Sequence, residues 1–128
     1  MQYEYFYGAQ AEQFSFYRIP KALFTEPNFR ELSTDAKVLY GILLDRMSLS
    51  LKNQWLDAQN KVYIIFTVEE IMDALNCANQ KATRLMVELE KQAGLIERKR
   101  QGLGKPNLIY VKNFAATINS KNCEKGDS

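Results

Sequence analysis

The pattern of apolar and polar residues predicts a central helix over residues 33–49. Apolar side chains recur there at helical spacing, and further apolar residues widen this stripe beyond that of a surface helix. Ser33 or Thr34 can cap the first turn, because their hydroxyl oxygens accept hydrogen bonds from free backbone N–H groups. We expect this segment to be the core helix of the domain.

The run VYIIF at residues 62–66 is short and rich in β-branched and aromatic residues, and it predicts a strand. Directly after it, Thr67 and Glu70 have the spacing of a capping box, so a short helix should begin there. A tight turn at residues 76–78 ends this helix. The polar segment before the strand is expected to be a loop whose Trp55 packs into the core.

A third helix should begin near residue 79, where apolar residues again recur at helical spacing. Gly94 is suited to the left-handed conformation that ends a helix. LIERKR and NLIYVK flank QGLGKP, so residues 95–112 predict a hairpin whose turn uses Gly102 and Gly104. Together these elements predict an α+β fold of the winged helix-turn-helix class, with a three-helix core and a β-hairpin wing.

The first 24 residues are unusually aromatic, and FSFYRIP within them could form a short strand that Pro20 ends. The rings could pack on the core of the domain. They could also form a surface for self-association, because Tyr and Phe are enriched at the centres of interfaces. We divide the chain into an aromatic arm (1–13), a domain (14–114) and a flexible tail or truncated linker (115–128).

Composition indicates one globular domain: 128 residues, 46% hydrophobic and 25% charged. No apolar run approaches the ~20 residues that span a bilayer, and nothing marks export, so we expect a cytoplasmic protein without a membrane partner. The positions of Cys77 and Cys123 favour reduced thiols over a disulfide. The chain has no histidine, which excludes the usual zinc sites, and we expect neither a metal nor a cofactor.

Charge is distributed unevenly along the chain. Residues 79–112 carry eight Lys/Arg against three acids, a net charge of +5, whereas residues 1–78 carry a net charge of −3. The positive segment coincides with the third helix and the predicted wing. A basic region of this kind is the electrostatic footprint of a nucleic-acid-binding protein.

The start of the third helix carries polar groups that suit base edges. Gln80, Lys81, Thr83 and Arg84 lie within about one turn, and this end of the helix reads bases in helix-turn-helix proteins. A solvated helix face is the alternative interpretation. In the wing, Arg98, Lys99 and Arg100 follow one another and Lys105 lies at the tip; protection of a strand edge by lysines is the competing explanation. If about 5–7 of these cations reach phosphates, log K should fall against log salt with a slope of about −5 to −6 per protomer.

Catalysis finds little support in the sequence. Without histidine there is no Ser-His-Asp triad and no His-ligated metal that could activate a tyrosine. The Gly-x-Gly at 102–104 lacks the continuation into a helix that a phosphate-binding loop needs. We therefore expect a binding protein and not an enzyme.

The motifs YRIPK (17–21), LYGILLDRMSLS (39–50), VYIIFT (62–67) and GLIERKRQGLGKP (94–106) occur in order at sensible spacing. Through them, residues 14–114 resemble the N-terminal domain of the plasmid replication initiator protein A family of Gram-positive bacteria. The resemblance implies a winged helix that binds double-stranded DNA at repeats of a plasmid origin and initiates theta-type replication. It also implies host replication proteins as partners of a C-terminal domain absent from this chain.

In that family the DNA contacts fall on the segments that correspond to 79–91 and 98–107. Ala78 departs from the pattern, since a capping Ser would be commoner there. Origins carry repeats, so a homodimer that pairs half-sites is expected, with the aromatic arm as its interface. The candidate DNA-binding residues are Asn79, Gln80, Lys81, Thr83, Arg84, Arg98, Lys99, Arg100, Lys105 and Asn107.

Two alternatives stay open. The same module serves transcriptional repressors, which would bind a promoter operator and not origin repeats. A winged helix can also bind protein, and the duplex affinity of such an adaptor would not change when its cations are replaced with Ala.

Overall fold

The computed structural model describes residues 2–8 and 13–115. Most of the predicted tail, with Cys123, lies outside the described residues. The elements are α1 (Ala22–Thr25), the 3₁₀ turn η2 (Pro27–Phe29), α2 (Thr34–Lys52), α3 (Val68–Leu75), α4 (Asn79–Val87), the π-helical turn η3 (Glu88–Gln92), β1 (Ile96–Lys99) and β2 (Leu108–Val111).

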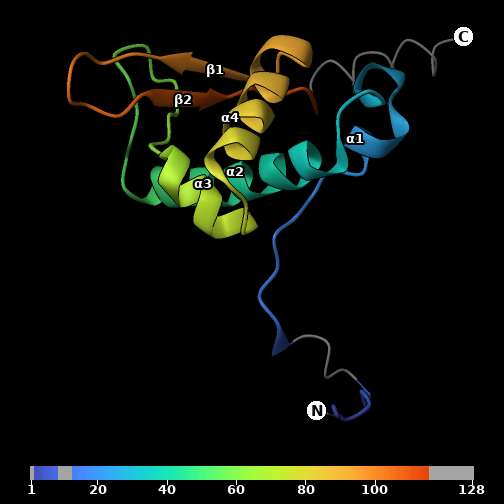
Figure 1. Cartoon of the computed structure of the whole chain (residues 1–128). Helices are drawn as coiled ribbons and strands as arrows, with labels where there is room; N and C mark the ends of the chain where they lie inside the picture. The colour runs from blue at the N-terminus through green and yellow to red at the C-terminus, as the bar shows by residue number, and fades with distance from the viewer. Residues whose placement is uncertain (1, 9–12, 116–128) are drawn as a thin grey trace, which may run out of the picture.

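Helices α2, α3 and α4 form a three-helix core, and the β1–β2 hairpin packs beside it and projects beyond it (Figure 1). Helix α4 contacts α2 and α3, and its continuation η3 leads directly into β1. This arrangement confirms the predicted α+β winged helix-turn-helix with three core helices and a hairpin wing.

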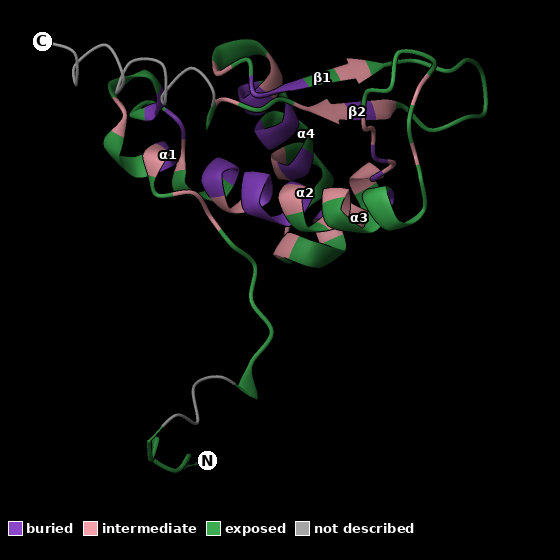
Figure 2. Ribbon diagram, turned by 180° about the vertical axis from the view of Figure 1, so that it is seen from behind, coloured by how far each residue is buried: buried purple, intermediate pink, exposed green. Residues whose placement is uncertain are grey.

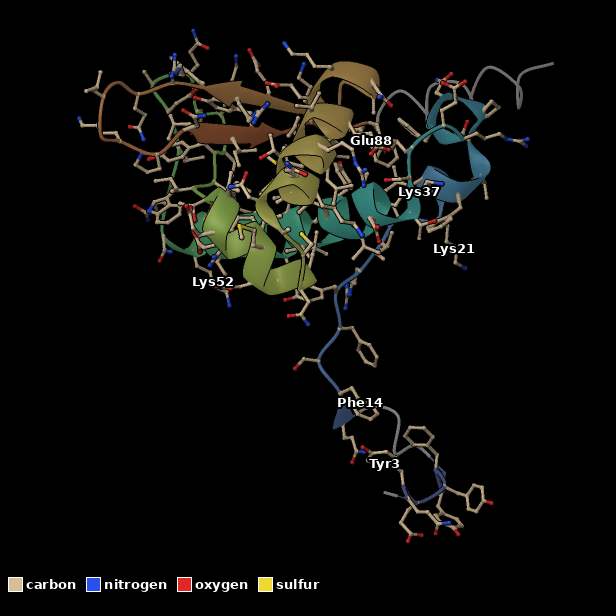
Figure 3. All side chains as sticks on the ribbon, viewed as in Figure 1. Tyr3, Phe14, Lys21, Lys37, Lys52 and Glu88 are labelled. Atoms are coloured by element: carbon tan, nitrogen blue, oxygen red, sulfur yellow. The ribbon has the colours of Figure 1, made fainter. Side chains whose placement is uncertain are left out.

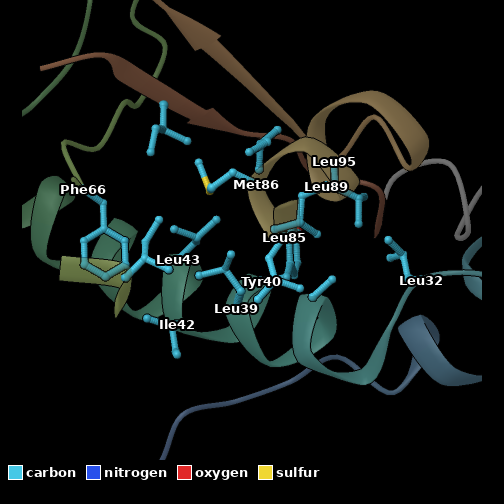
Figure 4. Packing of buried hydrophobic residues seen from close by; sticks show 14 of the residues in the cluster. Leu32, Leu39, Tyr40, Ile42, Leu43, Phe66, Leu85, Met86, Leu89 and Leu95 are labelled. Atoms are coloured by element: carbon cyan, nitrogen blue, oxygen red, sulfur yellow. The ribbon is translucent and has the colours of Figure 1, made fainter. Parts of the chain in front are cut away.

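Helix α2 is the central core helix, as predicted, although it ends at Lys52, three residues later than expected. Ser33 is the N-cap, and its hydroxyl oxygen accepts a hydrogen bond from the Ala36 N–H at 3.1 Å. Leu39 and Leu43 of α2 are fully buried and face Leu85 and Leu89 of the third-helix segment (Figure 4). Full burial of a leucine side chain contributes ~1.5–3 kcal/mol, so these contacts dominate the placement of α4.

The capping box at the start of α3 is confirmed. The Thr67 hydroxyl oxygen accepts a hydrogen bond from the Glu70 N–H at 3.2 Å, and the Glu70 carboxylate accepts one from the Thr67 N–H at 3.1 Å. The helix ends at Asn76, which adopts a left-handed φ of 52° and starts the tight turn into α4.

The prediction of a regular strand over residues 62–66 is wrong. Val62 pairs with Leu56 in one isolated bridge, and Ile64 pairs with Ile109 of β2 in another. Both hydrogen bonds of the Ile64–Ile109 pair measure 2.9 Å. Because the segment changes partner within two residues, no continuous ladder forms, and it adds only a single bridge to the two-stranded sheet.

Trp55 is half-buried and lies outside the main hydrophobic cluster, so the prediction that it packs into the core is wrong. Its ring stacks on Tyr63, with centroids 6.2 Å apart and an angle of 6° between the ring planes. The indole therefore holds the loop after α2 against the segment that follows it, and leaves the centre of the core to aliphatic side chains.

The hairpin has the predicted position and turn chemistry. Gly94 ends the third-helix segment with φ 67°, and the Leu95 N–H returns to the Leu89 carbonyl at 2.9 Å. β1 and β2 pair antiparallel from Ile96 opposite Val111 to Lys99 opposite Leu108. Residues 100–107 form the loop, in which Gly102 and Gly104 adopt φ values of 124° and 78°.

The aromatic arm leaves the body of the domain, and the interpretation that its rings pack on the core is wrong (Figure 3). Tyr3 and Tyr5 are 84% and 82% exposed, and Phe14 and Phe16 are exposed as well. No strand forms over 14–20. The chain after the arm stays exposed as far as Arg18 and reaches the body of the domain at Ile19. A Cβ on Gly41 would lie 2.9 Å from the Ile19 side chain, so glycine lets this segment pass close over α2.

Buried residues face one another across α2, α4 and the hairpin, whereas the loop of the wing and the described residues of the arm are exposed (Figure 2). Two charged residues, Lys37 and Glu88, are buried in this region. Glu88 of η3 is 8% exposed, and its carboxylate accepts hydrogen bonds from the backbone N–H of Ser33 and, at 3.0 Å, from the Ser33 hydroxyl. A carboxylate at this position also complements the N-terminal dipole of α2.

We expect Glu88→Ala to lower the free energy of unfolding by about 1–3 kcal/mol, because it leaves the two Ser33 donors without an acceptor. Gln92→Ala, at an exposed position of the same helical turn, is the control and should change it by less than about 0.5 kcal/mol. Urea unfolding of the two variants measures this. Equal stabilities would contradict the assigned role of Glu88.

Candidate nucleic-acid interface

The outer face of α4 is set by what the helix buries. Ala82, Leu85 and Met86 are buried, so the helical period of 3.6 residues directs the remaining side chains outward. Asn79, Gln80, Thr83 and Arg84 are exposed. The structure thus brings together four of the five predicted residues of this helix on one polar surface at its N-terminal half.

Within this surface the Thr83 hydroxyl donates to the Asn79 side-chain oxygen at 3.4 Å, which orders two neighbouring groups able to hydrogen-bond a base edge. Ala78 is the N-cap and supplies no side-chain hydrogen bond, in agreement with the departure noted in the sequence. The first turn of α4 therefore carries backbone donors that no cap occupies, at the positive end of the helix dipole.

Lys81 lies at the flank of α4 that faces α2. Its ammonium group forms an ion pair with the Asp35 carboxylate in the first turn of α2, at 2.7 Å. The side chains are 42% and 51% exposed, so solvent screens this pair. Lys81 is thus partly neutralised, which the sequence could not indicate because the two residues are far apart along the chain.

Arg98 of β1 forms hydrogen bonds inside the protein. Its guanidinium donates to the Glu90 carboxylate at 2.8 and 3.1 Å, and its backbone N–H donates to the same carboxylate at 3.1 Å. These hydrogen bonds from Arg98 hold the pKa of the Glu90 carboxyl below its usual value of 4.5. Only 25% of the Arg98 side chain is exposed, so this residue joins the wing to the third-helix segment.

The two faces of the hairpin differ in character. Alternation along β1 places Arg98 on the face toward the core, and Lys99 with Glu97 on the opposite face, beside Tyr110. Lys99, Arg100, Lys105 and Asn107 are exposed. The cations of the wing are therefore brought to its edges and tip, and they do not form one row.

A groove of about 250 Å³ lies where the wing meets the helices. Arg98, Lys105 and Asn107 line it from the wing, Thr67 from the start of α3 and Met86 from α4. The groove thus brings three predicted wing residues together, but none of the predicted residues of α4 lines it. In Figure 1, α4 lies at the front of the molecule and the loop of the wing projects to its left.

A larger cavity, of about 740 Å³, lies between the hairpin and the loop after α2. Its lining mixes acids with bases: Asp57 and Glu97 accompany Lys61, Lys99 and Lys112. Asp57 accepts a hydrogen bond from the Tyr110 hydroxyl at 3.0 Å, and its pKa is lowered chiefly by the Lys61 backbone N–H. A surface with both signs of charge fits a polyanion less well than the outer face of α4.

Sequence reasoning missed two residues of the exposed face. Val87 and Lys91 are exposed and continue the four-residue step that begins at Thr83. That spacing was a usable signal, but Val87 carries no polar group and Lys91 lies in the part of the segment that becomes η3. A valine methyl could contact a thymine methyl, and Lys91 could contact a phosphate.

Within residues 2–8 and 13–115, no group of three or more His, Cys, Asp or Glu is arranged to hold a metal ion. No helix in the same residues combines the length and apolarity that a bilayer crossing requires.

The Glu90–Arg98 contact generates a pH prediction. Because the pKa of Glu90 is lower in the folded chain than in the unfolded chain, the contact stabilises the fold above about pH 4.5, and this stabilisation is lost as the pH falls through the lower, folded pKa. Glutamine resembles a protonated carboxyl group. Glu90→Gln should therefore cost about 1–3 kcal/mol of stability at pH 7 and less at pH 3.

Urea unfolding of Glu90→Gln at both pH values measures the effect, and Glu97→Gln, at an exposed site on β1, is the control. A loss of stability that is the same at pH 7 and pH 3 would refute the charge-assisted contact.

The chain is similar in sequence and in fold to known proteins. Residues 15–124 match the family described as "Replication initiator protein A (RepA) N-terminus". A "41 kDa protein" of Lactobacillus helveticus is 32% identical over 103 residues, which are 80% of this chain and 28% of the relative. The chain thus spans well under half the length of that protein.

Solved structures agree in fold. An "N-Terminal domain of DNA binding protein" has 37% identity and a TM-score of 0.72, and the match covers 99% of this chain and 98% of the other. A "Structure of Rep-DNA complex" gives the same identity and TM-score, covering 98% of both chains. A "Structure of MDR initiator" has 38% identity and a TM-score of 0.67 over 93% of this chain and 98% of the other.

Proposed function

The chain belongs to the replication initiator protein A N-terminal family, and from this premise we propose that it binds double-stranded DNA in a sequence-specific manner at repeats of a plasmid replication origin. It acts by binding alone, without cofactor or catalysis, as the DNA-recognition domain that begins theta-type replication. Related solved structures described as a Rep-DNA complex and an initiator support this proposal.

The observation that carries the proposal is the outer face of α4. Its exposed N-terminal half presents amide, hydroxyl and guanidinium groups, and its other side is buried where α2 and α3 pack against the helix. A helix with this exposure can enter the major groove with its first turns toward the bases. In that pose Gln80 and Thr83 contact base edges, Arg84 reaches a guanine or a phosphate, and the wing lies along the flanking backbone.

The ion pairs reduce the number of cations that are available to contact phosphates. Lys81 and Arg98 each face a carboxylate, so they contribute less to phosphate binding than their charges suggest. Five other cations of α4, η3 and the wing form no ion pair with a described carboxylate, leaving Lys112 out of the count. They are Arg84, Lys91, Lys99, Arg100 and Lys105. With about five phosphate contacts, the slope of log K against log salt should be about −4 to −5 per protomer.

The triple variant Arg84→Ala, Arg100→Ala, Lys105→Ala should reduce that slope by about 3, because each lost phosphate contact removes about one unit. The matched control replaces three exposed cations outside α4 and the wing, Lys21, Arg30 and Lys52, with Ala and should leave the slope unchanged. Fluorescence anisotropy with a duplex of the origin repeat, measured over a salt series, reports both. Equal slopes for the two triple variants would contradict the proposed surface.

The site of binding separates initiation from repression. A footprint on repeats at a plasmid origin, or within the reading frame of the protein itself, supports the proposed function. Protection confined to a promoter operator would instead favour the repressor alternative. Contacts with host replication proteins belong to a second domain in this proposal, and the cytoplasm is the compartment that contains the plasmid.

We place the interface of a homodimer on the aromatic arm. Its rings are exposed, and Phe6 of the arm makes an edge contact with Phe14, just after the arm, at a centroid distance of 6.0 Å. Phe14 in turn contacts Phe16 at 6.3 Å. An exposed aromatic segment of this size is typical of a protein–protein interface. Pairing two domains would let one protein engage two repeats, which increases specificity beyond that of one reading helix.

Removal of residues 1–13 should convert the dimer into a monomer, because it deletes much of the exposed aromatic surface. Sedimentation equilibrium of the full and shortened chains, each at several concentrations, measures this. Circular dichroism controls for folding, since the core begins after the arm. A shortened chain that remains a dimer would exclude the arm as the interface.

A further inference from the structure

The wing ends in an apolar side chain whose exposure the core does not explain. Leu103 is fully exposed at the tip of the loop between β1 and β2. Single exposed leucines are common on protein surfaces, so exposure alone indicates nothing. The backbone and the charges around Leu103 make this position different from the others.

The loop fixes the direction of the Leu103 side chain. The Lys105 N–H bonds to the Gly102 carbonyl at 3.3 Å, which closes a turn with Leu103 and Gly104 at its corners. Gly104 has φ 78°, the value that a type II turn requires at its third residue. Below the turn, the Gln101 side chain donates to the Pro106 carbonyl at 2.8 Å and joins the two sides of the loop. The leucine is therefore presented outward on a closed turn.

Cations flank the leucine on both sides. Arg100 precedes it by three residues and Lys105 follows it by two, and both are exposed. An apolar group between two cations matches the cross-section of a DNA minor groove, in which phosphates border a slot about 6 Å wide with sugar walls. Proteins that enter this groove frequently insert Leu, Ile, Met or Phe between base steps.

The dimensions allow this contact. Leu103 lies four positions after Lys99, the last residue of β1, and this stretch can span at most about 13 Å. The minor groove is about 7.5 Å deep, so the tip can cross one phosphate backbone and reach its floor. With α4 in the major groove, the wing lies beside the adjacent minor groove, because the two grooves alternate along one side of the duplex.

We propose that Leu103 is an apolar wedge that enters the minor groove next to the segment read by α4 and partly unstacks a base step there. This inference rests on the proposed duplex binding and adds a second recognition element, which favours flexible pyrimidine–purine steps at one flank of the site. Such steps unstack at low cost, so the wedge adds specificity where no hydrogen bond is made to a base.

The test uses the full chain and a 40-base-pair duplex that the chain itself selects from a random-sequence pool. A footprint defines the segment of this duplex that the chain protects. The fluorescent base 2-aminopurine is then placed, one position at a time, beside that segment. The fluorescence of 2-aminopurine rises when its stacking is lost. The wild-type chain should raise it severalfold at one step outside the α4 footprint. Leu103→Ala should abolish the rise and weaken binding about tenfold with an unchanged salt slope, because no cation is lost.

Leu103→Met should retain both the signal and the affinity, since methionine keeps an apolar side chain of similar volume. Leu51→Ala, at an exposed leucine of α2, is the matched control and should behave as the wild type. Wild-type affinity and an unchanged fluorescence profile for Leu103→Ala would overturn the wedge while leaving the proposed function intact. If the wild-type chain selects no duplex, the proposed function fails and the wedge fails with it.

A contact between protein copies is the remaining explanation for an exposed leucine. If Leu103→Ala changes the sedimentation of the chain without DNA, the residue serves self-association and the wedge is overturned. Unchanged sedimentation together with the loss of the 2-aminopurine signal supports it.

Discussion

The burial of one side of the third helix against α2 is the constraint on which the rest of the structure depends. Leu85 and Leu89 are fully buried and face Leu39 and Leu43 of α2. Once that side is fixed, the period of the helix determines which side chains face solvent. The polar outer face of α4 therefore follows from core packing, so the same contacts that stabilise the fold orient the surface proposed to meet DNA.

Three carboxylates refine this placement at the edges of the helix. Glu88 binds the Ser33 N–H and hydroxyl at the start of α2, Asp35 pairs with Lys81, and Glu90 pairs with Arg98 of the wing. They connect α4 and its π-helical continuation to α2 on one flank and to the hairpin on the other. The last two ion pairs also make Lys81 and Arg98 less available to contact phosphates. The positive charge available for phosphate contact is thus smaller than the sequence count, and it is concentrated at Arg84, Lys91, Lys99 and the loop of the wing.

Local signals predicted most of the fold. The capping box at Thr67 and Glu70, the left-handed Gly94 and the glycines of the wing act within a few residues, so the sequence could locate them. Contacts between distant segments could not be predicted in the same way: the pairing of Glu90 with Arg98, the single bridge at Ile64 and the half-buried Trp55 depend on tertiary packing.

The aromatic arm had two interpretations, and its sequence pattern alone could not show that the rings leave the body of the domain. Most of the candidate site could be predicted because its helix is amphipathic. Val87 was not predicted because it carries no polar group, and Lys91 because it lies in the segment that becomes η3.

An NMR titration of the ¹⁵N-labelled chain with a selected duplex tests the central claim most directly, because it reports contacts residue by residue. The account predicts that amide shift changes concentrate in the first turns of α4 and in residues 98–107, with small changes in α1 and at the C-terminal end of α2. Changes centred on α1 or on the last turn of α2, with α4 unaffected, would contradict it.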